Sequence, residues 1–212
     1  MSTSAEPATR GLRLPRSERR AQLLGAAREV FVAQGYHASG MDDIAERAGV
    51  SKPVLYQHFP GKLDLYLALL DESSEVLVSS VAEALASTHD NQARVDALIA
   101  AYFSFVDEPG GAFRLVFESD LTQDPEVRTR IDEANIRCAG LVAEVIAEET
   151  DLPEDEAQLL GYGLIGLAQT AARSWLVFGH MSVPRPDAEA RAAALAWRGL
   201  SGFPRSGDVA PA

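Results

Sequence analysis

The segment at residues 39–62, SGMDDIAERAGVSKPVLYQHFPGK, contains two short helix patterns separated by Gly49. We expect Ser39 to cap the first helix and Ser51 to cap the second, because a serine hydroxyl can accept a hydrogen bond from the unpaired N–H groups of a helix start. Pro53 suits the first turn of the second helix, where an N–H group would be unpaired anyway. The first helix carries apolar residues at helical spacing, namely Met41, Ile44, Ala45 and Ala48. Together these features predict a helix-turn-helix whose second helix suits the major groove of DNA.

The charge of the chain is distributed unevenly. Its net charge is −12, which by itself opposes binding to nucleic acid. Residues 10–62, however, hold nine Lys or Arg and only five Asp or Glu, and both lysines of the chain, Lys52 and Lys62, fall there. This pattern favours a DNA contact at the basic end only, since an acidic surface elsewhere repels phosphates. The alternative is a solvated acidic surface that implies no partner.

Composition favours an all-α fold of about nine helices. Alanine is abundant, and no long stretch alternates β-branched with polar residues. Cys138 is the single cysteine, so the sequence allows no intramolecular disulfide and no cysteine-rich metal site. The sequence shows no signal peptide and no apolar run long enough to span a bilayer, and we expect a cytoplasmic protein with no membrane partner. It also lacks the motifs of enzymes, so we expect no catalysis, no cofactor and no metal.

Helix signals continue along the rest of the chain. We expect Ser17 to cap the first helix and Gly35 to end it in a left-handed conformation. Asp90 and the pair Asp124-Pro125 mark two later helix starts. Besides the two helices of the helix-turn-helix, the pattern predicts helices at about residues 17–34, 62–86, 91–108, 112–118, 125–149, 154–178 and 187–200.

These elements suggest four parts of the chain. Residues 1–15 are expected to form a disordered basic arm and residues 202–212 a disordered tail, with a DNA-binding domain at 16–62 and a second helical domain at 63–201 between them. Arg19 belongs to a series of arginines that leads from the arm into the first helix. A basic arm beside a helix-turn-helix can reach phosphates or an adjacent minor groove, and the alternative here is a solubilising tail.

The last two predicted helices are candidates for contact with a second copy of the chain. The helix at 154–178 is apolar nearly all round, which indicates burial on several sides. Helix-turn-helix proteins usually read two half-sites as dimers, so we expect a homodimer through these two helices. The alternative is a core helix of a monomer. The residues expected at the dimer interface are Tyr162, Ile165, Trp175, Leu195 and Trp197.

One series of positions between residues 31 and 62 is typical of a known family of regulators. The positions are Phe31, Gly35-Tyr36, Ser39-x-Met41-x-x-Ile44-Ala45, Ala48-Gly49-Val50-Ser51, Leu55-Tyr56-x-His58-Phe59 and Lys62. In these positions the chain resembles the TetR family of one-component transcriptional regulators. The resemblance covers about a quarter of the chain and departs from the family at Gly40, where the family usually has a Thr or Ser that contacts a phosphate.

The resemblance implies a double-stranded DNA operator and a small-molecule effector as partners. In this family the second domain encloses a ligand pocket and dimerises through its last two helices, so residues 63–201 are expected to bind ligand and to dimerise. We predict a repressor that a small, largely apolar effector releases from a palindromic operator by moving the helix at 62–86. Alternatives are an activator or a ligand-independent regulator of the same fold, and a helical ligand carrier.

The resemblance also implies roles for single residues. Lys52 can donate to a guanine edge or to a phosphate, and Ser39 can bind the phosphate that Gly40 has no side chain to reach, unless it serves as a cap. Tyr56 and His58 match phosphate ligands, although simple packing within the head would explain them too. The full set of expected DNA-binding residues is Arg19, Ser39, Lys52, Pro53, Val54, Tyr56, Gln57, His58 and Lys62.

Candidates for the ligand pocket are aromatic or polar residues that interrupt apolar helix faces. An ordinary position in the core or an interface is the alternative for each of them. Arg173 can meet an acidic group of a ligand or pair with a nearby carboxylate at the dimer interface. The full set is Phe103, Phe117, Asn135, Cys138, Gln169 and Arg173.

Overall fold

A computed structural model describes residues 14–108, 111, 113, 121, 123–177 and 183–200. These residues form eight α-helices and no strand, which confirms the all-α fold. The short helix expected at 112–118, the arm up to residue 13 and the tail after residue 200 lie outside the described residues, apart from Phe113, which is buried. The helices are α1 (Arg16–Ala38), α2 (Met41–Arg47), α3 (Lys52–His58), α4 (Lys62–Ala86), α5 (Asn91–Val106), α7 (Pro125–Glu149), α8 (Glu154–Val177) and α9 (Arg185–Leu200).

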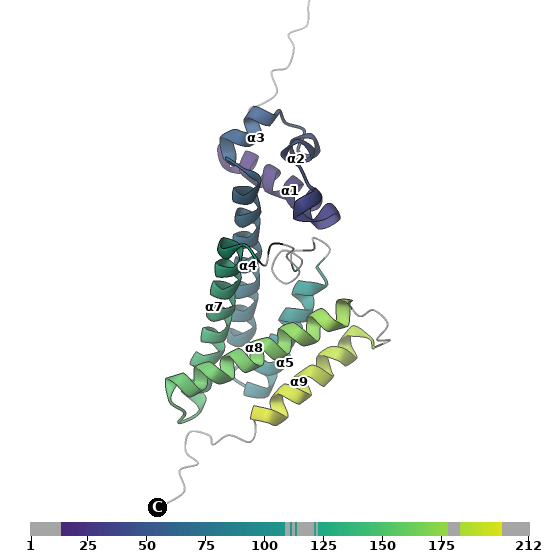
Figure 1. Ribbon diagram of the computed structural model, residues 1–212. Coiled ribbons are helices and arrows are strands. Elements are labelled where there is room, and N and C mark those ends of the chain that lie inside the picture. The colour runs from purple at the N-terminus through teal and green to yellow at the C-terminus, as the bar shows by residue number, and fades with distance from the viewer. Residues whose placement is uncertain are drawn as a thin grey trace, which may run out of the picture.

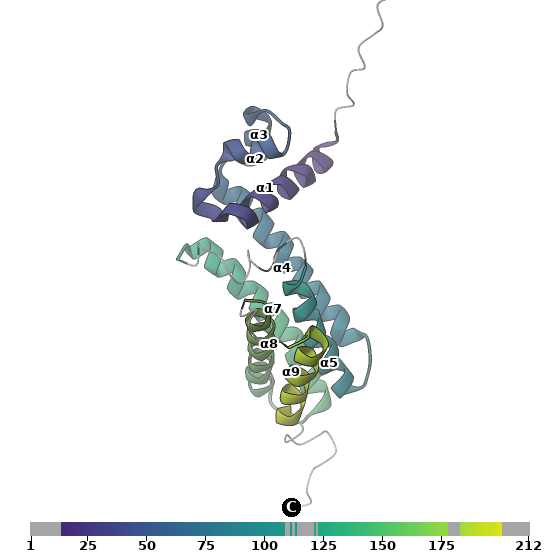
Figure 2. The ribbon, with the colours of Figure 1, turned by 90° about the vertical axis from the view of Figure 1, so that its right-hand side faces the viewer.

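The helices form two groups joined by α4. Helices α1, α2 and α3 pack together at one end of the molecule, and we call this group the head (Figure 1). Helix α4 starts in the head and continues into a bundle with α5, α7, α8 and α9, which we call the body (Figure 2). Within the body α7 packs against α4 and α8, while α9 packs against α5 and α8. Among the described residues no helix is long and apolar enough to cross a membrane.

Several helix starts lie where the sequence predicts them. Asp124 accepts hydrogen bonds from the N–H groups of Glu126 and Val127 at 2.9 and 3.2 Å, with Pro125 in the first turn of α7. Asp90 accepts from Ala93 N–H at 2.7 Å at the start of α5. These carboxylates satisfy N–H groups that the helix leaves unpaired, so the local sequence determines where each helix begins.

None of the three serines expected to cap helices in the head does so with its hydroxyl. Ser51 occupies the N-cap position of α3, as predicted, but makes no side-chain hydrogen bond to the helix start. Helix α2 is capped at Gly40 instead of Ser39, and the Gly40 N–H donates to the Asp43 carboxylate at 2.8 Å. Ser39 instead donates its hydroxyl proton to the carbonyl of Gly35 at 2.5 Å. Helix α1 begins at Arg16, one residue before the predicted cap Ser17, and has no side-chain cap.

Two glycines shape the chain around the helix-turn-helix. Gly49, between α2 and α3, has a φ of 65°, a left-handed conformation that glycine adopts without steric cost. Gly35 has a φ of 78° and a ψ of 168° and kinks α1, after which the helix resumes up to Ala38. The predicted break at Gly35 is therefore present, but with extended ψ and inside a longer helix.

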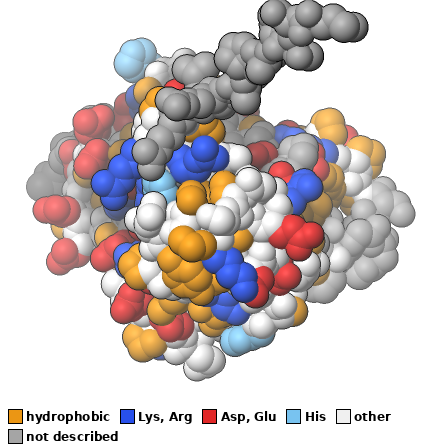
Figure 3. Space-filling model, turned by 90° about the horizontal axis from the view of Figure 1, so that it is seen from above, with side chains coloured by type: hydrophobic (Ala, Val, Ile, Leu, Met, Phe, Trp, Pro, Cys, Tyr) orange, Lys and Arg blue, Asp and Glu red, His pale blue; other side chains and the backbone are white. Residues whose placement is uncertain are grey.

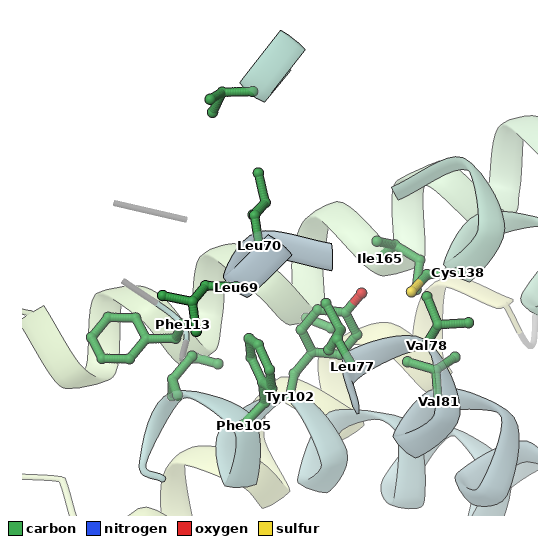
Figure 4. Close-up of a cluster of buried hydrophobic side chains, with 14 of the residues drawn as sticks. Leu69, Leu70, Leu77, Val78, Val81, Tyr102, Phe105, Phe113, Cys138 and Ile165 are labelled. Carbon is green, nitrogen blue, oxygen red and sulfur yellow. The ribbon is translucent and has the colours of Figure 1, made fainter. Parts of the chain in front are cut away.

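The body has a continuous apolar core built from several helices. Figure 4 shows Leu77 and Val81 of α4 close to Tyr102 of α5 and Cys138 of α7, and all four side chains are fully buried. Burial away from water raises the pKa of both the Tyr102 hydroxyl and the Cys138 thiol, so both groups are protonated at neutral pH. Side chains from α4, α5 and α7 therefore form one core, with α4 running through it and on into the head.

Candidate DNA-binding surface and ligand cavity

Helix α3 presents a face of polar and apolar side chains to solvent and an apolar face to the core of the head. Leu55 is fully buried and Phe59, just after the helix, is 2% exposed, so both pack in the core as the spacing predicts. The remaining side chains of α3 are exposed or half-buried, and they are Lys52, Pro53, Val54, Tyr56, Gln57 and His58. Six of the expected DNA-binding residues therefore share one accessible surface, with Tyr56 48% exposed.

Lys52, the first residue of α3, is paired with a carboxylate of the neighbouring helix. Its Nζ lies 2.6 Å from Asp42 Oδ2, and both side chains are more than half exposed. The hydrogen bond to Asp42 raises the pKa of Lys52, so the ammonium remains charged at neutral pH. Asp42 was not expected at this site, because ten residues separate it from Lys52 and nothing in the local pattern joins them.

Lys62 and Ser39 hold the connection between α1 and α2. Lys62 Nζ donates to the carbonyls of Tyr36 and Ser39 at 2.8 and 2.9 Å and lies 4.2 Å from the centre of the Tyr36 ring. The two carbonyl bonds use two of the three N–H donors of the ammonium, so Lys62 has a structural role within the head. Ser39 is only 4% exposed, which places it inside the head and not on the surface where a phosphate contact was expected.

Arginines of the head also have partners within the chain. Arg19 Nη1 donates to Gln22 Oε1 at 2.6 Å, while Gln22 Nε2 donates to the carbonyl of Ala48 at 2.9 Å and so ties α1 to the turn between α2 and α3. Arg47 of α2 forms an ion pair with Glu29 of α1. Seen from the α3 end, Lys and Arg side chains lie among hydrophobic ones, with Asp and Glu side chains beside some of them (Figure 3). The surface of the head is thus a mixture of charges and not a uniformly basic patch.

A cavity of about 450 Å³ lies in the body, at the end remote from the head. Its apolar wall includes Leu98 of α5, Val145 of α7, Leu160 of α8 and Trp197 of α9. Polar residues line it near the α4–α5 connection and the end of α7, and they are His89, Asp90, Asn91, Gln92, Arg94, Glu149 and Thr150. Ten apolar and seven polar residues line the cavity, so it suits a small molecule that carries both apolar and polar groups.

Arg94 organises the polar side of this cavity. Its Nε donates to the carbonyls of Leu85 and Thr88 at 3.1 and 2.9 Å, and its Nη1 donates to Asn91 Oδ1 at 2.9 Å. Its Nη1 also lies 3.4 Å from Glu149 Oε1, with the Arg94 side chain 11% exposed. The guanidinium therefore joins the end of α4 to the start of α5 and to the end of α7.

The pocket residues expected from the sequence lie elsewhere. Phe103 and Cys138 are buried in the core, at 1% and 0% exposure. Asn135 and Gln169 are half-buried, Arg173 is exposed, and Phe117 lies outside the described residues. None of the five described candidates lines the 450 Å³ cavity. The cavity is formed by helix ends that meet only in the folded chain, and no local sequence signal marks them.

The expected dimer residues divide between surface and core. Tyr162 of α8 and Leu195 of α9 are 41% and 65% exposed. Ile165 is 2% exposed and belongs to the core, and Trp197 is half-buried in the cavity wall. Trp175 is half-buried, and its Nε1 donates to the carbonyl of Val183 at 3.0 Å. The structure adds two exposed apolar residues of α8, Leu159 and Val177, at 70% and 47% exposure.

Comparison with known proteins identifies transcriptional regulators as relatives of this chain. Residues 23–69 match the family described as bacterial regulatory proteins, tetR family. The HTH-type transcriptional activator FasR of Mycolicibacterium smegmatis is 45% identical over 195 residues, which cover 92% of this chain and 89% of FasR.

Solved structures agree with this match. A tetR-family transcriptional regulator from Streptomyces coelicolor has a TM-score of 0.74 and 26% identity over 89% of this chain and 83% of its own. The fold is also that of FadR from Bacillus subtilis in complex with stearoyl-CoA, with a TM-score of 0.68 and 21% identity over 86% of this chain and 98% of FadR.

Proposed function

Since the chain belongs to the tetR family of bacterial regulatory proteins and is therefore a DNA-binding transcriptional regulator, we propose that it binds a palindromic operator as a homodimer and that a small, largely apolar effector controls this binding. The observation that carries the proposal is the combination of an accessible α3 in the head with a cavity in the body that has an apolar wall and a polar side. In this assignment residues 16–62 read DNA, and residues 63–201 bind the effector and dimerise. The relatives are named as regulators, which supports a non-enzymatic role at the DNA in the cytoplasm.

The proposed DNA contact uses α3 in the major groove. Pro53 and Val54 suit thymine methyl groups, Gln57 suits a base edge, and Tyr56 and His58 suit phosphates. Arg19 and Lys62 would add positive charge at the edges of this surface. In a dimer the two copies of α3 must lie about 34–36 Å apart to enter successive major grooves. A change in that distance would weaken contacts at both half-sites together.

The proposed dimer uses the outer faces of α8 and α9. Leu159, Tyr162, Val177 and Leu195 are large apolar residues exposed on these two helices, and a second copy of the chain would remove them from water. A twofold interface would bring the same faces of both copies together.

The cavity is the proposed effector site. Its apolar wall supports a largely apolar ligand, and the complex of FadR with stearoyl-CoA is a precedent for a long acyl chain in this fold. Leu85 near the end of α4 lines the cavity, whereas Lys62 at the start of α4 is bound to the head. An effector that binds better to one position of α4 than to another would therefore change the position of the head.

We favour activation as the outcome of DNA binding. Its support is the 45% identity with FasR, which is named an activator. Repression with release by the effector, the expectation from sequence, is the alternative. The two differ in a direct test, transcription in vitro from the target promoter with and without the protein.

The central experiment measures operator binding and its response to ligands. Wild-type protein selects an operator from random double-stranded oligonucleotides, and a thermal-shift screen of apolar and acyl compounds then identifies ligands. We expect a ligand that raises the melting temperature to change the operator affinity at least fivefold. Failure to enrich any sequence at low salt would refute DNA reading, and ligands that bind without changing operator affinity would refute effector control.

A further inference from the structure

A carboxylate of α2 lies beside the first residue of the proposed recognition helix α3. Asp42 Oδ2 is 2.6 Å from Lys52 Nζ, and the two side chains are 65% and 58% exposed. The capping contact at the start of α2 is made by Asp43, whose carboxylate accepts the Gly40 N–H. Asp42 is therefore not needed for that cap, and its carboxylate accepts a hydrogen bond from Lys52 instead.

The pairing limits what Lys52 can contact on DNA. An ammonium has three donors, and Asp42 takes one of them. A phosphate oxygen bound to the same ammonium would lie about 4–5 Å from the Asp42 carboxylate, given the usual length of such bonds. This separation is well inside the screening length of about 8 Å at physiological salt, so the two anions would repel each other.

A guanine edge meets no such repulsion. Its O6 and N7 are neutral acceptors in the major groove, and they can share the ammonium with a carboxylate. We propose that Asp42 is a specificity-determining residue that directs Lys52 to a guanine edge and away from the phosphate backbone. The proposal rests on the proposed contact of α3 with DNA, and it decides between the two roles that the sequence leaves open for Lys52.

The salt dependence of binding separates the two roles. Each phosphate that a protein neutralises on duplex DNA contributes about 0.9 to the slope of log affinity against log salt concentration. A lysine that is paired with Asp42 and bound to a neutral base contributes little to this slope. A lysine bound to phosphate contributes the full amount.

The test uses the selected operator, a non-operator duplex and operators in which each G·C pair is replaced by A·T, over a series of salt concentrations. Lys52→Gln is expected to weaken operator binding about fivefold and to abolish the preference at one G·C position. Because Lys52→Gln alone leaves the Asp42 carboxylate unpaired beside the DNA, the salt slope is compared between the wild type and the Asp42→Asn/Lys52→Gln double variant, which removes both charges of the pair. These two slopes should be equal. Asp42→Asn is expected to strengthen non-operator binding, reduce the same base preference and steepen the slope by about 0.9, an increase that Lys52→Gln removes in the double variant.

Glu46→Gln is the matched control, because it removes one exposed carboxylate from the same helix α2. It should leave the base preference unchanged, and thermal unfolding shows whether each variant is folded. The inference is overturned if the double variant keeps the base preference of the wild type and its slope is smaller by about 0.9, or if Asp42→Asn behaves as Glu46→Gln does. Wild-type protein that selects no sequence would instead refute the proposed DNA reading itself, and this inference with it.

Discussion

Gly161→Ala should destabilise the protein, although the same exchange usually stabilises a helix. Gly161 is buried in α8, and a Cβ atom there would lie 2.4 Å from the carbonyl oxygen of Ala139 in α7. Ordinary contacts begin near 3.4 Å, so α7 and α8 would have to separate by roughly 1 Å. The obstacle is backbone and cannot rotate away, as a side chain could.

Two opposing effects set the magnitude of this change. Alanine in a helix interior is favoured over glycine by about 0.5–1 kcal/mol. Overpacking a close contact costs about 1–3 kcal/mol, so we expect a net loss of about 1–2 kcal/mol in the free energy of unfolding. For a chain of this size such a loss lowers the melting temperature by about 2–8 °C.

Thermal and urea unfolding at matched protein concentrations measure the effect of Gly161→Ala. Gly140→Ala in α7 is the control, because a Cβ atom at Gly140 meets nothing within 4 Å. The control should be as stable as the wild type or more stable, by up to about 1 kcal/mol. A Gly161→Ala variant that matched this control would show that the close approach of α7 and α8 is wrong.

Three further substitutions test other parts of the molecule. Leu195→Glu places a charge on an exposed apolar position of α9, and sedimentation should show monomers in place of the proposed dimers, with operator affinity reduced at least tenfold. Val145→Phe reduces the space in the cavity, and titration should show at least tenfold weaker effector binding while operator binding without effector is retained. Glu75 has a pKa below its ordinary 4.5 because Arg137 donates hydrogen bonds to it, so its contribution to stability is present at neutral pH and disappears as the pH falls through the lowered pKa. Urea unfolding at a series of pH values should therefore show a smaller acid-induced loss of stability for Glu75→Gln than for the wild type.

Helix boundaries were predictable wherever a single residue determines them. Lys62–Ala86 and Pro125–Glu149 agree with prediction because Gly61 and the pair Asp124-Pro125 act locally. The role of Ser39 was not predictable in this way. At the kink in α1 the Ser39 hydroxyl donates to the carbonyl of Gly35, and the Asp43 carboxylate accepts the hydrogen bond of the Gly40 N–H.

The two candidate sites also differ in whether local sequence is sufficient to predict them. The accessible face of α3 follows from helical spacing around Leu55, so the sequence was sufficient to find it. The partner of Lys52 lies ten residues away on another helix, and the cavity joins ends of five helices. Contacts of this kind depend on how helices are placed in three dimensions, which periodicity along one helix does not specify.

Helix α4 is held from two sides near its middle, and this bears on how the body can act on the head. Arg28 of α1 lies 3.2 Å from Glu72, while Arg130 of α7 lies 2.8 Å from Asp71 on the adjacent position of α4. Partly exposed ion pairs such as Arg28–Glu72 are worth about 0–1 kcal/mol each. Couplings between ligand sites are typically about 1–3 kcal/mol, so an effector could supply enough free energy to break such a pair. If the proposed effector acts by moving α4, Arg28→Ala should therefore change the effector concentration that alters operator binding while the melting temperature stays close to that of the wild type, and effector titration and thermal unfolding measure the two effects.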